Sequence, residues 1–204
     1  MKRTIITLFC LISLSLPVFS QNEEASKPLE VGITLDWISK TQLQRDANIA
    51  QIQSVLFKDE TVLKYDKKTF REMNGDFLKD SDFLNNYEEI TAGKKEDADK
   101  NYCGFYLGKW LIAYGIQYKK NMKNIYYYDA MGRLEWVDYF SDNYPNFPYI
   151  SYQYTTNGKL VAAYYYVSKD DQYVYNPDRK FKGRWYKENL YNRNAKVTMT
   201  RSNW

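Results

Sequence analysis

The sequence has 204 residues, with 29 lysines and arginines, 25 aspartates and glutamates, and no histidine. The absence of histidine removes the commonest general base, the commonest zinc ligand and the usual serine or cysteine catalytic triad. Two cysteines are too few for a cysteine metal cluster, and the sequence contains no phosphate-binding glycine loop or calcium loop. We therefore predict no catalytic residue, no cofactor site and no metal site.

The first twenty residues have the order of a bacterial export signal. Lys2 and Arg3 supply the charged end, an apolar run covers residues 5 to 16, and Val18-Phe19-Ser20 forms a cleavage site. The apolar run is shorter than the ~18 residues that span a bilayer, which favours a cleaved signal peptide over an anchor. We expect cleavage near Ser20–Gln21, no integral membrane segment in the mature chain, and a periplasmic or extracellular location.

Charge and tyrosine content both divide the mature chain near residue 101. Residues 21 to 101 have a net charge of −5, and residues 102 to 204 have a net charge of +7. Of the 21 tyrosines, 19 lie between Tyr102 and Tyr191. Cleavage would leave Cys103 as the single cysteine, which we interpret as a buried small hydrophobe. The predicted parts are a signal peptide at 1–20, a flexible mature N-terminus at 21–36, a mostly helical region at 37–100 and an antiparallel β-hairpin domain at 101–204.

Two segments of the helical region have helical spacing. An amphipathic helix is predicted between Ser39 and Phe57, with Ser39 or Thr41 as the N-cap. Its two adjacent apolar stripes are Leu43, Ala47 and Ala50, and Ile49, Ile52 and Leu56. A second helix is predicted to begin near Ser81 and to continue to Ile90.

After residue 102 the pattern alternates, and one short frame occurs four times. It has a tyrosine, then four residues later a turn residue, a cation and a large apolar residue. The copies are Tyr128 to Leu134, Tyr154 to Leu160, Tyr175 to Phe181 and Tyr191 to Val197. An Asp, Thr or Asn follows each tyrosine, and such side chains bond the backbone N–H groups of a type I turn. Gly132 and Gly158 occupy the position that needs a positive φ, whereas Arg179 and Ala195 replace them, so we expect the last two turns to differ.

The first copy, Tyr128-Asp129-x-x-Gly132-Arg133-Leu134, resembles the tyrosine-aspartate repeat of Rhs-type bacterial surface and toxin-shell proteins. The resemblance covers residues 126 to 197 and implies a series of β-hairpins. The copies are spaced by 26, 21 and 16 residues, whereas true repeat arrays hold a period. We predict an α+β fold, in which a small helical N-terminal part precedes a tyrosine-rich, mostly antiparallel β-meander of about seven to nine strands.

Alternation along the strands divides the aromatic residues between two faces of the sheet. The frame tyrosines share an apolar face with Trp136, Tyr164 and Trp185, and we predict that this face is the core. The opposite face is mixed, and it is either a solvated surface or a recognition surface, because tyrosine and arginine are common in binding hot spots. The candidate ligand-binding residues on it are Tyr127, Tyr139, Tyr165, Arg184 and Tyr186.

A basic run from Arg179 to Lys187 is interleaved with aromatic residues, which suits an anionic ligand, although lysines also protect a solvated strand edge. We expect an exported bacterial protein with a binding or envelope-structural role. Its partner would be acidic glycan, cell-wall material or another envelope protein, and not nucleic acid. One alternative is a carboxylate-dependent glycan or cell-wall hydrolase. A second alternative, suggested by the terminal Trp204, is an outer-membrane β-barrel.

Overall fold

The computed structural model of the chain describes residues 36–58, 67–74 and 83–201. The predicted signal peptide at 1–20 and the predicted flexible segment at 21–36, apart from its last residue, lie outside these residues. The described α-helices lie between residues 36 and 91, the first strand begins at Lys100, and one turn of 3-10 helix, η3 Lys119–Asn121, lies among the strands.

Ten antiparallel strands form one sheet, in which each strand pairs with its neighbours in the sequence. Their bounds are β1 Lys100–Leu107, β2 Trp110–Tyr118, β3 Asn124–Asp129, β4 Leu134–Phe140, β5 Tyr149–Thr155, β6 Leu160–Ser168, β7 Asp171–Tyr175, β8 Phe181–Tyr186, β9 Asn189–Tyr191 and β10 Val197–Thr200. The predicted antiparallel meander is confirmed. It has more strands than predicted, and the α+β fold is dominated by β-structure because the helices are few and short.

The four frame copies form hairpin turns of the same geometry. In each turn, the residue after the tyrosine donates its backbone N–H to the carbonyl oxygen of the residue four positions later. The residue in the glycine position donates its N–H to the carbonyl oxygen of the residue after the tyrosine. The N···O distances are 2.9 to 3.0 Å. The φ angles in that position are 74° at Gly132, 76° at Gly158, 61° at Arg179 and 59° at Ala195. Our expectation that the last two turns differ is wrong. The side chain after each tyrosine accepts turn N–H groups, and this bonding holds the left-handed conformation even without glycine.

Ala195→Gly is expected to raise the free energy of unfolding by about 0.5 to 1 kcal/mol, because a left-handed alanine is strained and glycine is not. The matched control is Ala47→Gly, which lies exposed in a helix and should lose about 1 kcal/mol. Urea unfolding of both variants measures the difference. Equal destabilisation by the two substitutions would contradict the strain at Ala195.

Each frame hairpin also contains a β-bulge directly after the turn. In the first hairpin, Tyr128 pairs with Leu134 and Tyr127 pairs with Trp136, which leaves Glu135 as an extra residue in β4. The corresponding extra residues of the other three hairpins are Val161, Lys182 and Thr198. Alternate residues of a strand point to opposite faces. Each bulge therefore moves the later residues of its own strand to the face opposite the one that simple alternation predicts.

The bulges change which residues share a face. Trp136, Tyr164 and Trp185, which we predicted beside the frame tyrosines, lie in two clusters on the other side of the sheet. The frame tyrosines themselves lie in the main core, as predicted. We call the face that carries the frame tyrosines the outer face, and the face that carries Trp136, Tyr164 and Trp185 the inner face.

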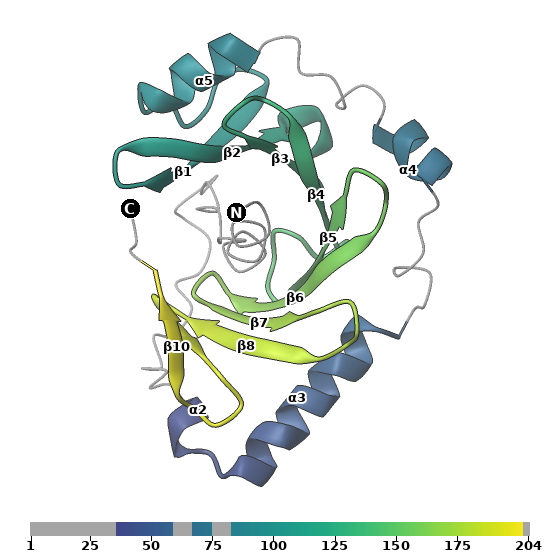
Figure 1. The fold of residues 1–204 in the computed structure, drawn as a ribbon. Helices are drawn as coiled ribbons and strands as arrows, with labels where there is room; N and C mark the ends of the chain where they lie inside the picture. The colour runs from purple at the N-terminus through teal and green to yellow at the C-terminus, as the bar shows by residue number, and fades with distance from the viewer. Residues whose placement is uncertain (1–35, 59–66, 75–82, 202–204) are drawn as a thin grey trace.

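The four α-helices of the described residues cover the outer face, and the sheet curls so that its inner face looks toward the centre of the molecule (Figure 1). The helices are α2 Asp36–Ser39, α3 Gln42–Leu56, α4 Lys67–Asn74 and α5 Phe83–Thr91. The two predicted helices correspond to α3 and α5. Thr41 is the N-cap of α3 and forms a capping box with Gln44, as the sequence suggested. Leu43 of the first predicted stripe is 80% exposed, whereas Leu56 of the second stripe is buried against the sheet.

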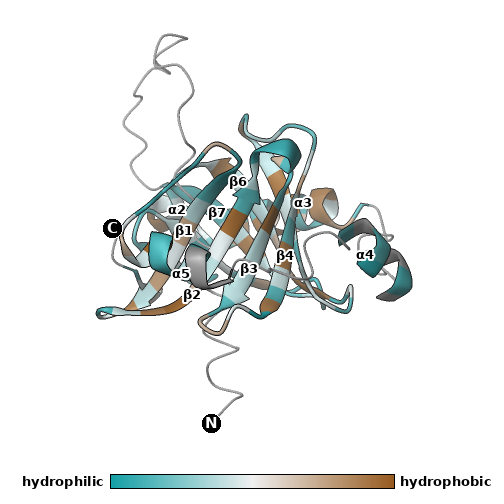
Figure 2. Ribbon diagram, turned by 90° about the horizontal axis from the view of Figure 1, so that it is seen from above, coloured by the Kyte–Doolittle hydropathy of each residue, from teal (hydrophilic) through white to brown (hydrophobic). Residues whose placement is uncertain are grey.

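Tyrosine hydroxyls join the helices to the outer face. Tyr175 donates to the backbone oxygen of Ile49 at 2.8 Å, and Tyr152 donates to that of Leu56 at 2.6 Å, so two strands hold α3. Hydropathy alternates along the strands, whereas α4 is largely hydrophilic (Figure 2). Within the described ranges, no helix is long and apolar enough to cross a membrane.

Candidate ligand site on the inner face

The five predicted ligand-binding residues do not share a face. Tyr127 is buried on the inner face, in the cluster that contains Trp136. Tyr139, Tyr165 and Tyr186 pack against the main core on the outer face. Strand alternation predicted that these residues share one mixed surface. They do not, because the bulges place Tyr127 on one face of the sheet and the other tyrosines on the opposite face.

Tyr139 illustrates the structural role of the outer-face tyrosines. Its ring packs edge to face against Phe70 with centroids 6.1 Å apart. Its hydroxyl donates to Asn74 Oδ1 at 2.8 Å, and the same amide oxygen accepts from Tyr126 at 3.2 Å. These contacts hold α4 against the sheet.

Arg184, the fourth of the predicted ligand residues, lies in a buried ion-pair network. It donates to both carboxylate oxygens of Asp171 at 2.8 and 2.6 Å, and its third nitrogen donates to Asp36 at 3.0 Å. Its guanidinium lies over the rings of Trp37 and Tyr173, at 5.3 and 4.9 Å from their centroids. The side chain is 5% exposed, and these partners fasten α2 to the sheet.

The inner face has aromatic walls and a polar middle. Its buried aromatic residues are Phe105, Tyr127, Trp136, Tyr149, Tyr164, Tyr166 and Trp185. Between them, Asp138 of β4 pairs with Gln153 of β5, and Ser151 of β5 pairs with Phe140. Gln172 of β7 pairs with Tyr166 on one side and with Trp185 on the other. Four polar side chains from three strands are thus placed on one concave surface.

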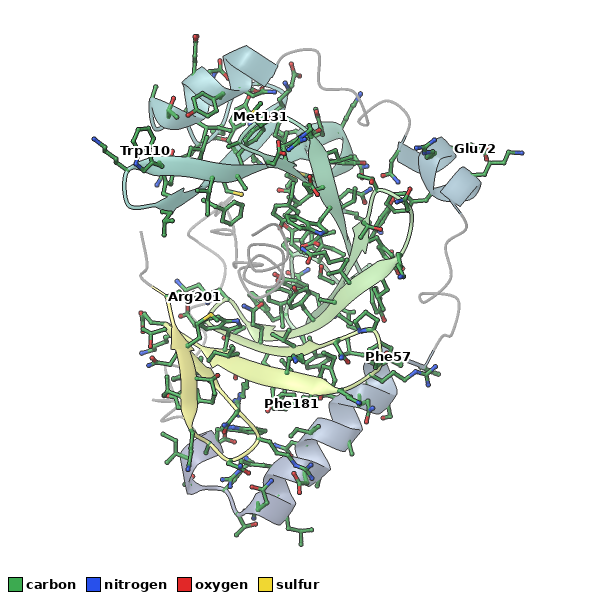
Figure 3. All side chains as sticks on the ribbon, in the orientation of Figure 1. Phe57, Glu72, Trp110, Met131, Phe181 and Arg201 are labelled. Atoms are coloured by element: carbon green, nitrogen blue, oxygen red, sulfur yellow. The ribbon has the colours of Figure 1, made fainter. Side chains whose placement is uncertain are left out.

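Several of these polar groups are buried without a hydrogen-bond partner. Within the described residues, the atoms concerned on the inner face are Asp138 Oδ1, Ser151 Oγ, Gln153 Oε1, both amide atoms of Gln172, and Arg201 Nη1. Arg201 follows β10, and its guanidinium lies 4.5 Å from the ring centroid of Trp185 (Figure 3). A buried polar group that lacks a partner costs roughly 1 to 3 kcal/mol. The fold therefore tolerates an unfavourable concentration of such groups at one place.

Asp138 is the acidic centre of this group. The Tyr127 hydroxyl donates a hydrogen bond to Asp138 Oδ2 at 3.1 Å. Burial raises the pKa of Asp138 to about 7, although the neighbouring Gln153 amide and the Tyr127 hydroxyl oppose this change. Near neutral pH the carboxyl is thus present in both forms, and it can donate or accept a hydrogen bond. Of the two aspartates buried in the described ranges, only Asp138 lies on the inner face, because Asp171 faces Arg184.

Close packing surrounds Asp138 on the β2 side. A methyl group at Gly115 would lie 2.7 Å from Cys103 Sγ and 3.1 Å from the Tyr127 ring, so only glycine fits there. Burial raises the pKa of Cys103 to about 12, which keeps the thiol protonated and poorly nucleophilic. Cys103 is half-buried and packs against the inner-face cluster that contains Tyr127, so it is less enclosed than the buried small hydrophobe that we predicted.

Sequence reasoning missed this site because it did not place the bulges. A usable signal was present, since Asp138, Ser151, Gln153 and Gln172 each lie within a strand that is rich in aromatic residues. Polar residues in the interior of such strands indicate either a hydrogen-bonded network or a site. Within the described ranges, no group of three or more cysteine or acidic side chains could hold a metal ion.

Comparison of the chain with family models, with curated proteins and with solved structures finds no match.

Proposed function

We propose that this protein binds a polar, uncharged ligand of the size and character of a sugar, and that the ligand lies against the inner face. One observation carries the proposal: the buried polar atoms without partners are gathered between aromatic rings on one concave surface. Binding sites commonly combine a mostly apolar and aromatic lining with a few convergent polar groups. A ligand that bonds these atoms would remove the cost of leaving them without partners.

A sugar suits this surface on chemical grounds. Its ring presents C–H groups that pack on flat aromatic side chains such as Trp185, and its hydroxyls both donate and accept hydrogen bonds. Gln172 offers an amide donor and an amide acceptor, and Ser151 offers a hydroxyl. Export to the bacterial envelope, which we predict from the sequence, would place the protein where glycans are abundant. Both the export and the glycan partner are parts of the proposal.

A glycan array probed with the purified protein tests this function. We expect binding to a subset of neutral oligosaccharides, followed by a change of tryptophan fluorescence in solution, because Trp136 and Trp185 line the inner face. Gln172→Leu should weaken that binding at least tenfold, which corresponds to losing hydrogen bonds worth about 1.4 kcal/mol or more.

The same variant separates a binding role from a structural one. Leucine removes an unpartnered buried amide, so Gln172→Leu should leave the melting temperature unchanged or raise it. The control Lys159→Leu, on an exposed turn, should change neither binding nor stability much. Absence of any neutral glycan ligand, or full affinity in Gln172→Leu, would contradict the proposal.

A further inference from the structure

A groove with a volume of about 570 Å³ lies on the opposite side of the sheet from the inner face. One wall is α3, which contributes Ile49 and Gln53. The other wall is formed by the β7–β8 turn, the β9–β10 turn and the start of β8, including Phe181 (Figure 3). We call this feature the basic groove.

Charge in the basic groove is strongly unbalanced. Four cations line it, namely Arg179, Lys180, Lys182 and Arg193, against the single acid Asp46. Arg193 bonds Asp46 at 2.6 Å and holds the pKa of that carboxyl below its usual value, so the acid is already neutralised by a partner. Lys180 and Lys182 are exposed, and no ion pair of the described residues involves either. The groove therefore keeps a net positive charge.

The two turns are held in place by α3. Gln53 donates its amide to the carbonyl oxygen of Arg179 at 2.6 Å, and Arg45 donates to that of Arg193 at 2.9 Å. The Arg179 guanidinium lies 5.7 Å from the ring centroid of Phe57. Cations on turns that are fastened in this way are preorganised, which lowers the entropic cost of binding.

Two local features of the third hairpin place its lysines at the groove. Lys180 follows Arg179, whose left-handed backbone closes the turn. Lys182 is the extra residue of the bulge in β8, between Phe181 and Gly183. Phe181 packs on Trp37 with ring centroids 5.9 Å apart, so the apolar floor of the groove is continuous with the core.

We propose that the basic groove binds an acidic polysaccharide, with Lys180 and Lys182 pairing with sugar carboxylates and Phe181 packing against a sugar ring. Cations alone would suit any polyanion. The apolar floor formed by Phe181 and Ile49 favours a chain with C–H faces over a polyphosphate, which has none. This site is separate from the inner face, so either site can exist without the other.

Calorimetric titration with oligogalacturonate tests the proposal. The protein should bind this probe, and the affinity should fall as salt is raised because exposed charges are screened. The double variant Lys180→Glu/Lys182→Glu should lose roughly tenfold or more in affinity, since two attractions become repulsions. Asp46→Asn, which removes the only acid among the lining residues, should bind more tightly than the wild type.

The matched control is Lys159→Glu/Lys169→Glu, which makes the same change of net charge on other exposed turns and should keep wild-type affinity. Unchanged affinity in the groove variant, or an equal loss in the control, would overturn the proposal. Tighter binding of inorganic polyphosphate than of oligogalacturonate would overturn it as well, as would the absence of binding by the wild type.

Discussion

Arg184→Ala is expected to lower the free energy of unfolding by about 3 to 5 kcal/mol, as is typical when one partner of a buried ion pair is removed. The substitution leaves Asp171, which is 4% exposed, without its two guanidinium hydrogen bonds. It also breaks the bond to Asp36 and removes the cation that lies over the rings of Trp37 and Tyr173. Chemical denaturation monitored by circular dichroism measures the loss.

An exposed arginine–aspartate pair provides the control for Arg184. Arg193→Ala breaks the surface pair with Asp46 and should cost far less stability than Arg184→Ala, because solvent screens exposed charges. Arg184→Met combined with Asp171→Leu should recover much of the stability that Arg184→Ala loses, because no buried charge is then left unpaired. Wild-type stability in Arg184→Ala would mean that this side chain has no role in holding α2.

The second large effect is a dependence of stability on pH that Asp138 causes. Burial raises the pKa of its carboxyl to about 7 in the folded protein, from a usual value of 3.8. As pH rises above about 4, the unfolded chain loses this proton while the folded protein keeps it, so stability falls until the folded carboxyl also ionises near pH 7. Between pH 5 and pH 8 we expect the wild type to lose roughly 2 to 3 kcal/mol of unfolding free energy.

Urea unfolding of wild type and Asp138→Asn at the two pH values tests this effect. Asparagine does not titrate, so the variant should show a much smaller loss between pH 5 and pH 8. Asp99→Asn, on an exposed turn, should keep the wild-type dependence. Hydrogen bonds lower the pKa values of Asp36 and Asp97, but the stability those carboxyls confer is lost only in more acidic solution. Identical pH dependence in wild type and Asp138→Asn would show that Asp138 is not buried as a neutral acid.

Local sequence chemistry was sufficient to predict the hairpins. An Asp, Thr or Asn after each frame tyrosine bonds the turn N–H groups, and this signal is contained within six residues. The helix after Thr41 was predictable for the same reason, because its capping box lies within four residues. Features whose determinants are local can be read from one sequence.

The faces of the sheet could not be predicted in the same way. A bulge such as that at Glu135 is defined by pairing with another strand, and no residue within β4 marks it. One unplaced residue per hairpin moved Trp136 and Trp185 to the opposite face, and with them the position of the candidate site. The ion pairs of Arg184 were not predicted for a related reason, since they depend on the pairing of β7 with β8, which brings Asp171 close, and on Asp36, which is 148 residues away in the sequence.

The indole signals of the protein in a two-dimensional ¹⁵N NMR spectrum test most directly whether the inner face is the ligand site. Trp136 and Trp185 lie on the inner face, Trp37 belongs to α2 and is buried against the outer face, and Trp110 is exposed at the tip of the β1–β2 hairpin (Figure 3). Titration with a neutral oligosaccharide identified on the array should shift the signals of Trp136 and Trp185 and leave those of Trp37 and Trp110 in place. Shifts confined to Trp37 or Trp110 would contradict an inner-face site.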